Sequence, residues 1–426
     1  MPERHPTADA PRVIVVGAGP AALAVALAAD CHHLIDRLEV VDPSGRWLAA
    51  WDERFAAQGI AHLRSPAVHH PHPDPFALLA SCEPDELVSS GNTRLPTSAG
   101  FRRFVTASIE AADLGDRVQP RALTSLALDS RGRARLTLDD GSQRCAEHVV
   151  VATNAREVLL PAAVTHLRDH PRVAIGTAAR IADTPVGGRV AVLGGGLSAA
   201  HLAVGAAERG AEVHLLTRRR LTVRRFDTHP SWLGPSKRRP FEREPDPFLR
   251  RRAIDRARGG GTIPHRMRAR LQDHVDAGAI TLHERATIVS ADADTDRVCL
   301  QLRGSTRLDV DLLWTATGGA VDVTRDALCR RLQEQFPTTI ADGLPELTAD
   351  LRWPGTNVHL VGAVAGLTLG PTAGNLIGHR RAAQRLVAAW QGHDPAHADR
   401  ITTGAGACPR RHRPACITRR VLTGAG

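Results

Sequence analysis

The sequence predicts an α/β protein in which one strand–glycine turn–helix unit occurs twice. Val13–Val16 is a short run of β-branched residues, typical of a buried parallel strand, and it leads into Gly17-Ala-Gly19-Pro-Ala-Ala22 and an apolar helix pattern. Much later, Val190–Leu193 leads into Gly194-Gly-Gly196-Leu-Ser-Ala199 and a second helix over 200–208. One glycine turn is weak evidence, but two in the same context predict two Rossmann-like dinucleotide-binding domains.

The spacing of each glycine turn has a physical reason. The first glycine makes a tight turn, the second lets the backbone approach a pyrophosphate, and the third, small residue packs the helix on the strand. The N-terminus of the helix then offers free N–H groups to the phosphates. The predicted cofactor-binding residues are Gly17, Gly19, Pro20 and Ala22 in the first turn, and Gly194, Gly196, Ser198 and Ala199 in the second.

The residue after the second strand of each unit discriminates between cofactors. Asp42 follows the strand Leu38–Val41, and a carboxylate there accepts hydrogen bonds from ribose hydroxyls and repels a 2′-phosphate, which indicates FAD. In the second unit the strand over 213–216 leads into Thr217 followed by Arg218 and Arg219. Arginine suits a 2′-phosphate by charge and by its bidentate geometry, so NADPH is favoured over NADH. The alternative for these arginines is a solvated basic strand end.

The rest of the chain repeats the same plan. Short strands are expected over 123–128, 134–138 and 148–151, and again over 286–289, 297–302 and 308–314. A further buried strand over 358–361 and a helix over 375–390 predict a split FAD-binding domain. We therefore expect its first part at 1–165, an inserted NADPH-binding domain at 166–314, its closing part at 315–392 and a poorly ordered tail at 393–426. The N-terminus of the last helix would point its positive end at the flavin.

Composition excludes several other classes of protein. The longest apolar stretch near the N-terminus is too short to cross a membrane, and no signal peptide is visible. Seven scattered cysteines lack CxxC spacing, which favours a reducing, cytoplasmic location. The net charge of +10 is almost entirely arginine, with Lys237 the only lysine, and aromatic residues make up only 3%. Nucleic-acid binding is therefore not expected.

Several polar and aromatic segments have more than one interpretation. The loop Val68–Asp74 contains three histidines, but consecutive histidines point in different directions, so no metal site is predicted. Trp47 and Trp51 are spaced one helical turn apart, which favours packing over stacking on a flavin. Arg64 is expected to be exposed, although it could contact a phosphate or a carboxylate. The Arg-rich segment 218–270 is a solvated face, a phosphate-binding region or a docking site for an acidic carrier protein.

Together these motifs resemble class B flavin monooxygenases, in particular the lysine/ornithine N-hydroxylase-like branch. The motifs that carry the resemblance are Gly17–Leu23, Leu63–His70, Pro96–Ser98, Gly194–Ala199, Trp232–Pro235, Ala316–Gly318, Leu369–Pro371 and Asn375–Gly378. The resemblance implies that Trp51, Thr317, Gly318, Gly362, Leu369 and Pro371 also contact cofactors. It further implies that His69, His70 and Asn375 lie near the flavin.

The resemblance also implies a reaction. NADPH reduces FAD, O2 adds at the flavin C4a, and the hydroperoxide transfers one oxygen to a small nucleophile, an amine or amino acid, free or carrier-bound. The first alternative is a FAD- and NAD(P)H-dependent dehydrogenase or reductase without oxygenation. The second is a non-catalytic flavin-binding regulatory protein, because the chain has no tyrosine and Asn154 stands where the family has glycine. The sequence predicts no oligomeric state.

Overall fold

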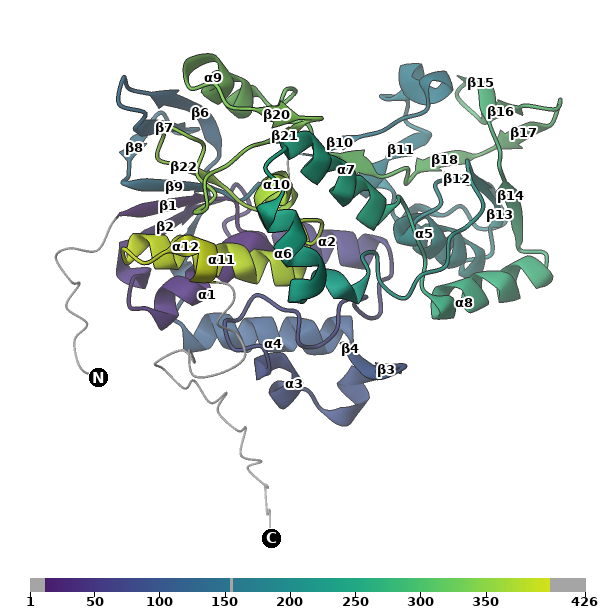
Figure 1. The fold of residues 1–426 in the computed structure, drawn as a ribbon. Helices are drawn as coiled ribbons and strands as arrows, with labels where there is room; N and C mark the ends of the chain where they lie inside the picture. The colour runs from purple at the N-terminus through teal and green to yellow at the C-terminus, as the bar shows by residue number, and fades with distance from the viewer. Residues whose placement is uncertain (1–11, 154–155, 399–426) are drawn as a thin grey trace, which may run out of the picture.

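The computed structural model describes residues 12–153 and 156–398, which form two lobes built around two parallel sheets (Figure 1). Both sheets have five strands, and every strand pair in them is parallel. The first has the order β22 (Val358–Leu360), β9 (His148–Val151), β1 (Val13–Val16), β2 (Leu38–Val41) and β5 (Val118–Gln119). The second has the order β11 (Val173–Ile175), β18 (Leu312–Thr315), β12 (Arg189–Leu193), β13 (Glu212–Thr217) and β14 (Ile280–Glu284).

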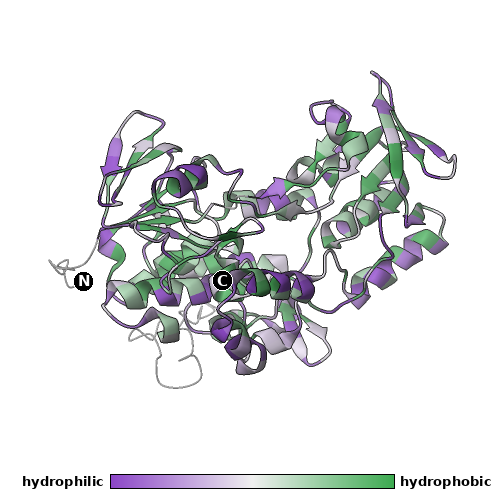
Figure 2. Cartoon of the chain, turned by 45° about the horizontal axis from the view of Figure 1, so that its top comes forward, coloured by the Kyte–Doolittle hydropathy of each residue, from purple (hydrophilic) through white to green (hydrophobic). Residues whose placement is uncertain are grey.

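Helices cover both sheets and the region between them. In the first lobe these are α1 (Pro20–Cys31), α2 (Ala49–Ala57), α3 (Ala77–Ser81), α4 (Ser98–Ala111), α9 (Ala327–Gln335), α10 (Gly366–Leu369), α11 (Leu376–Trp390) and α12 (Pro395–Ala398). In the second lobe α5 (Leu197–Glu208) and α8 (His265–Asp276) flank the sheet, while α6 (Pro235–Arg243) and α7 (Pro247–Arg258) lie between the lobes (Figure 1). Green apolar residues gather in the strands and in the helices that pack on them (Figure 2). Helices α1 and α5 are apolar around most of their circumference, and most of their residues are buried.

Small antiparallel sheets complete each lobe. They comprise β6 (Leu123–Leu128), β7 (Ala134–Leu138) and β8 (Gln143–Cys145) in the first lobe, and β15 (Ile288–Ala293), β16 (Val298–Leu302) and β17 (Arg307–Val310) in the second. Two-stranded pairs are β3 (Leu87–Ser90) with β4 (Thr93–Pro96), β10 (Glu157–Val158) with β19 (Gly319–Ala320), and β20 (Ile340–Ala341) with β21 (Leu344–Pro345). The β10–β19 pair joins the two connections between the lobes.

The structure corrects three expectations about these elements. The single strand expected over 308–314 is two strands, because Asp311 breaks it: its backbone N–H and its carboxylate both bond the backbone of Arg189. The strand expected over 286–289 begins at Ile288 and runs to Ala293. Trp47 and Trp51 do not share a helical turn, because the chain reverses at Leu48 (φ 60°) before α2 begins.

Two other observations concern the ends and the helices of the chain. Most of the tail expected at 393–426 lies outside the described residues, and only 393–398, with the short α12, can be described. Within residues 12–153 and 156–398, no helix has both the length and the apolar character needed to span a membrane.

A buried histidine pair joins β9 to β22 and makes stability depend on pH. His359 is fully buried; its Nδ1–H donates to the carbonyl of Asp350 (2.8 Å), so its Nε2 accepts from Nδ1–H of His148 (3.0 Å). Burial and the neighbouring ring lower the pKa of His148 to about 4. His148 binds a proton near pH 6.5 in the unfolded chain but only near pH 4 in the folded one. Its contribution to the free energy of unfolding is therefore fully present above pH 6.5 and is lost as the pH falls toward 4.

We expect His148→Gln to flatten this acid limb of the stability profile. Glutamine keeps a donor for His359 but does not titrate, so the free energy of unfolding should change less between pH 7 and 4, by about 1–3 kcal/mol. Urea unfolding at a series of pH values measures the effect. His166→Gln, at an exposed position, is the matched control. Identical profiles for His148→Gln and the wild type would show that the pair does not titrate as described.

Candidate functional site

The first glycine turn leaves open space above its backbone. Gly17 adopts φ +100°, and its N–H donates to the carbonyl of Val41 (2.8 Å). A Cβ at Gly19 would meet no protein atom within 4 Å. A side chain at this position would therefore clash with a bound ligand but not with the protein. Helix α1 begins at Pro20 with Gly19 as its N-cap, and no side chain caps its first N–H groups. These free donors fit a pyrophosphate, as the sequence predicts.

Asp42 lies at the end of β2 and braces this turn. One carboxylate oxygen accepts from the N–H of Ala18 (3.0 Å), and the other accepts from the N–H and hydroxyl of Ser44 (2.9 and 2.5 Å). Ala22 is fully buried against the strands. The carboxylate is therefore held beside the glycine turn, where the ribose of a dinucleotide would reach it.

The second glycine turn has the same geometry but less open space. Gly194 adopts φ +146°, and a Cβ there would lie 2.3 Å from the carbonyl oxygen of Ala316. Gly196 is the N-cap of α5, again without a side-chain cap, and Ser198 and Ala199 follow in its first turn. A Cβ at Gly261 would lie 2.9 Å from Cα of Gly196. Gly261, the last residue of the run Gly259–Gly261, therefore packs directly on this turn. The sequence analysis did not anticipate this contact, although the glycine run was visible.

Strand register identifies a residue that the sequence analysis passed over. Val16 pairs with Val41 in the first sheet and Leu193 pairs with Leu216 in the second, so Thr217 occupies the place of Asp42. Its hydroxyl donates to the carbonyl of Arg219 (2.6 Å). A neutral hydroxyl at this position removes the carboxylate that would repel a 2′-phosphate.

Arg218 and Arg219 follow Thr217 on the surface. Both are exposed, and Arg219 donates from Nη1 to the carbonyl of Gly259 (3.2 Å). The guanidinium of Arg218 forms no hydrogen bond or ion pair with any residue in the part of the chain that the structure describes. Arg218 is thus available to an anion at the end of β13.

Of the two candidate histidines, His70 is buried and His69 is half-buried, and both are neutral at neutral pH. His70 is fully buried, with Nε2 3.2 Å from the carbonyl of Pro75 and its ring edge-on to Phe104. Burial lowers the pKa of His69 to about 4, with smaller contributions from Arg380 and Arg381. Burial likewise lowers the pKa of His70. At neutral pH neither ring carries a charge, so both side chains are better suited to line a pocket that excludes water than to act as general acids.

Asn375 lies at the N-terminus of α11, where several predicted residues meet. Its Nδ2 donates to the carboxylate of Asp227 (3.4 Å), which also forms an ion pair with Arg258 (3.2 Å). Arg258 in turn donates to the carbonyl of Pro371 (2.8 Å). Asp227 and Arg258 come from the Arg-rich segment, and their partnership across the lobes was not predictable from sequence spacing.

The remaining predicted residues lie around these elements. Thr317 donates its hydroxyl to the carbonyl of Leu159, and Gly318 accepts from the N–H of the same residue, beside the β10–β19 pair. Gly362 (φ +91°) lies two residues after the end of β22, and Leu369 ends α10 in a buried position. The ring of Trp51 stacks on Phe55 with centroids 4.4 Å apart, as expected for a packing residue.

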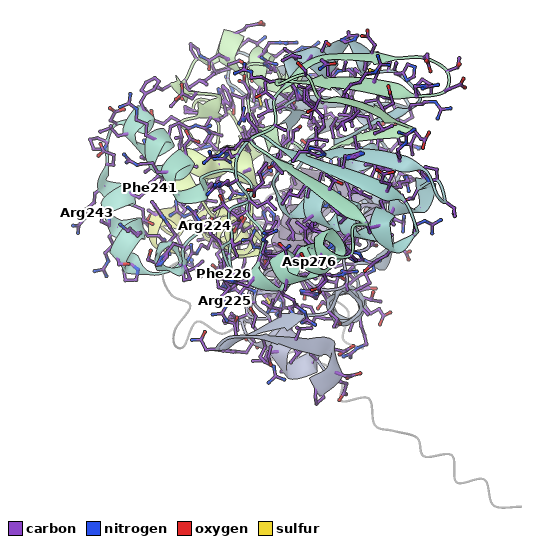
Figure 3. All side chains as sticks on the ribbon, turned by 90° about the vertical axis from the view of Figure 1, so that its right-hand side faces the viewer. Arg224, Arg225, Phe226, Phe241, Arg243 and Asp276 are labelled. Atoms are coloured by element: carbon purple, nitrogen blue, oxygen red, sulfur yellow. The ribbon has the colours of Figure 1, made fainter. Side chains whose placement is uncertain are left out.

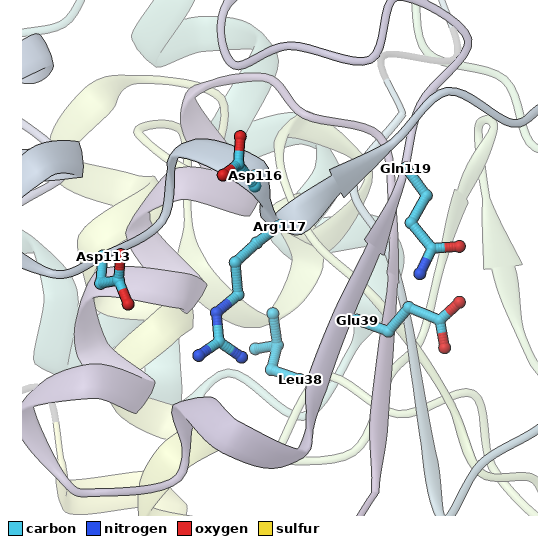
Figure 4. A pocket seen from close by; sticks show the side chains of 6 residues that line it. All are labelled: Leu38, Glu39, Asp113, Asp116, Arg117 and Gln119. Atoms are coloured by element: carbon cyan, nitrogen blue, oxygen red, sulfur yellow. The ribbon is translucent and has the colours of Figure 1, made fainter.

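A pocket elsewhere on the surface contains none of these residues. It has a volume of about 430 Å³ and lies beside β2 and β5, lined by Leu38, Glu39, Asp113, Asp116, Arg117 and Gln119 (Figure 4). Among residues 12–153 and 156–398, no group of three histidine, cysteine or acidic side chains could hold a metal ion. The candidate site is therefore the region that holds the two glycine turns and the start of α11.

Known structures share this fold across nearly the whole chain. A cadaverine monooxygenase of the desferrioxamine pathway from Erwinia amylovora, bound to FAD, has a TM-score of 0.72 at 14% identity, covering 91% of this chain and 95% of that chain. The ornithine N-hydroxylase of Kutzneria sp. 744, with reduced FAD, NADP+ and L-ornithine, has 0.71 at 16% identity, covering 90% and 99%. The L-lysine 6-monooxygenase of Pseudomonas syringae has 0.67 at 18% identity, covering 90% and 99%.

At these identities the structural likeness establishes the fold. No curated protein sequence matches this chain significantly. The sequence profile of the pyridine nucleotide-disulphide oxidoreductases matches residues 11–231, which is more than half of the chain. The chain therefore belongs to the pyridine nucleotide-disulphide oxidoreductase family.

Proposed function

We propose that this chain is an NADPH-dependent flavin monooxygenase that transfers one oxygen atom of O2 to a small nucleophilic substrate, an amine. FAD would bind at Gly17–Ala22 and NADPH at Gly194–Ala199. The observation that carries the proposal is the pair of uncapped helix N-termini at glycine turns, one beside Asp42 and the other beside Thr217. The shared fold with N-hydroxylating enzymes supports it.

The residues around the two turns fit these cofactors. The open space at Gly19 admits a pyrophosphate, and the N-terminus of α11 offers a positive dipole end close to Asn375. FAD, when bound there, would accept hydride from NADPH and activate O2. His70, which is buried, and His69, which is half-buried, are both neutral and would help to exclude water from the reacting atoms. An amine must lose its proton to act as a nucleophile, because only the neutral form has a free electron pair on nitrogen.

Two of the free thiols in the described part of the chain, those of Cys82 and Cys329, are poorly suited to thiolate chemistry. Burial raises the pKa of Cys82 to about 11 and also raises that of Cys329. A disulfide reductase needs a reactive thiolate at neutral pH, which neither side chain provides. Cys145 and Cys299 lie on β8 and β16, in the antiparallel sheets of different lobes.

Isotope incorporation tests this function. The purified holoenzyme is supplied with NADPH, 18O2 and, separately, cadaverine, L-ornithine and L-lysine, and the products are analysed by mass spectrometry. We expect at least one amine to gain a single 18O atom and to raise the ratio of product to NADPH consumed. NADPH oxidation that yields only hydrogen peroxide with every amine would favour the reductase. Bound FAD that NADPH does not reduce would favour the regulatory protein.

A further inference from the structure

Arg64 is almost fully occupied by hydrogen bonds to the other lobe. Its Nε donates to the carbonyl of Arg225 (3.1 Å) and its Nη1 to the carbonyl of Thr262 (3.2 Å). Its Nη2 donates to the carbonyl of Arg224 (2.7 Å) and to the hydroxyl of Thr262 (2.9 Å). The expectation of an exposed side chain is therefore wrong. Because these donors are used, Arg64 has little capacity left for a phosphate or a substrate carboxylate.

The acceptors of Arg64 belong to two paired segments, 222–227 and 258–263, which we call the strap. The N–H of Arg224 donates to the carbonyl of Ile263 (2.9 Å), and the N–H of Ile263 donates to the carbonyl of Thr222 (3.0 Å). Gly261, next to Thr262, packs on Gly196 in the second glycine turn. Arg64 therefore bonds Thr262, and the neighbouring Gly261 contacts the predicted pyrophosphate site of NADPH.

The strap is bound to the first lobe at further points. Arg225 donates to the side chains of Asn92 (3.1 Å) and Thr93 (2.6 Å) in the β3–β4 hairpin. Figure 3 labels Arg224, Arg225 and Phe226 of the strap close to one another. At the other end, Asp227 and Arg258 bond Asn375 and Pro371 beside α11. The strap therefore touches both predicted cofactor sites.

Arginine is required at position 64 by the geometry of its acceptors. Three carbonyls and one hydroxyl converge on it from two chain segments, and only a planar, forked guanidinium can donate to all of them at once. Lysine is a compact point charge with donors that diverge from one atom, so it can satisfy only part of this set. The bonds of Arg64 hold the two segments of the strap in one register.

We propose that Arg64 is a positioning residue that fixes the strap on the second glycine turn and so sets the placement of the nicotinamide relative to the flavin. The proposal rests on the two cofactor sites proposed above, and it does not depend on oxygenation. A displacement of about 1 Å in a hydride-transfer geometry can cost about 100-fold in rate. Loss of Arg64 should therefore act on flavin reduction and on NADP+ binding without removing FAD.

The experiment compares Arg64→Lys and Arg64→Met with Arg94→Met. Arg94 is exposed on β4 and is the matched control, because its side chain contacts neither the strap nor a glycine turn in any bond described. Anaerobic stopped-flow mixing with NADPH measures flavin reduction, and calorimetry measures the Kd of NADP+. We expect reduction to slow about 10- to 100-fold in both Arg64 variants and the Kd to rise. FAD content and reduction by dithionite should match those of Arg94→Met.

Amide hydrogen exchange supplies a readout that requires no turnover. Amides of residues 259–263 should exchange faster in Arg64→Met than in Arg94→Met, while those of β1 and α1 stay unchanged. Unchanged flavin reduction and unchanged exchange would overturn the proposal. A parallel fall in FAD content, melting temperature and reduction rate would also overturn it, because Arg64 would then be a general structural residue. A wild-type enzyme that NADPH reduces but that oxygenates no amine would refute the monooxygenase alone.

Discussion

A Gly19→Val variant is expected to fold and to purify without FAD. The position has an ordinary backbone conformation, and a Cβ there meets no protein atom within 4 Å, so valine costs the fold little. The added methyl groups would occupy the space that a pyrophosphate needs to reach the first N–H groups of α1. Loss of two charge-assisted hydrogen bonds of about 1.5–3 kcal/mol each should weaken FAD binding by at least about 100-fold. Flavin absorbance per protein measures the result.

Two other glycines separate binding from folding in this experiment. Gly115 also has open space around its Cβ position but lies on the surface away from the turn, so Gly115→Val should retain FAD. Gly17 adopts φ +100° with Ala152 only 3.2 Å from its Cβ position, so Gly17→Val should lower the melting temperature as well. A yellow Gly19→Val protein with wild-type FAD content would refute the first cofactor site.

The double substitution Arg218→Ala, Arg219→Ala should convert a preference for NADPH into near-equality with NADH. Each guanidinium–phosphate contact contributes about 1.5–3 kcal/mol, so removal of both should raise KM for NADPH by about 100-fold or more. KM for NADH should change by less than about threefold, because NADH lacks the 2′-phosphate that these side chains would bind. Steady-state kinetics with both nucleotides measure the difference.

The control for this variant must keep the same net charge. Arg168→Ala, Arg303→Ala removes two exposed arginines elsewhere, and it should leave both KM values near those of the wild type. An equal rise in KM for NADPH and NADH in the Arg218, Arg219 variant would contradict the assignment. It would indicate a solvated strand end that attracts any anionic nucleotide by its charge alone.

The fold class was predictable because its signals are local. Strand β1, the Gly17–Ala22 turn and helix α1 follow one another within one short segment, and the same is true of the second unit. The predicted α/β fold with two Rossmann-like sheets is confirmed. Boundaries were less predictable where one side chain decides them, as at Asp311, whose bonds to Arg189 divide one apolar run into two strands.

The contacts between the lobes were not predictable from sequence. Arg64 and Thr262 are far apart in the chain, and no spacing rule joins them. The partnership of Asp227 with Asn375 likewise depends on how α11 meets the strap. The equivalence of Thr217 with Asp42 could have been found by aligning the two strand ends in place of counting from the first glycine. Whether the predicted residues hold FAD and NADPH stays a prediction that the variants above decide.

Strand β22 has a consequence for synthesis of the chain on the ribosome. The edge of β9 is hydrogen-bonded to Val358–Leu360, which is translated long after β1, β2 and β9. Until that late segment emerges, the nascent first lobe exposes a buried, apolar strand edge with unpaired backbone groups, a condition that invites pairing with other chains. The second lobe, whose sheet is complete at Thr315, can fold earlier. Aggregation during expression should therefore decrease when translation of the residues between β9 and β22 is fast, or when chaperones protect the incomplete sheet.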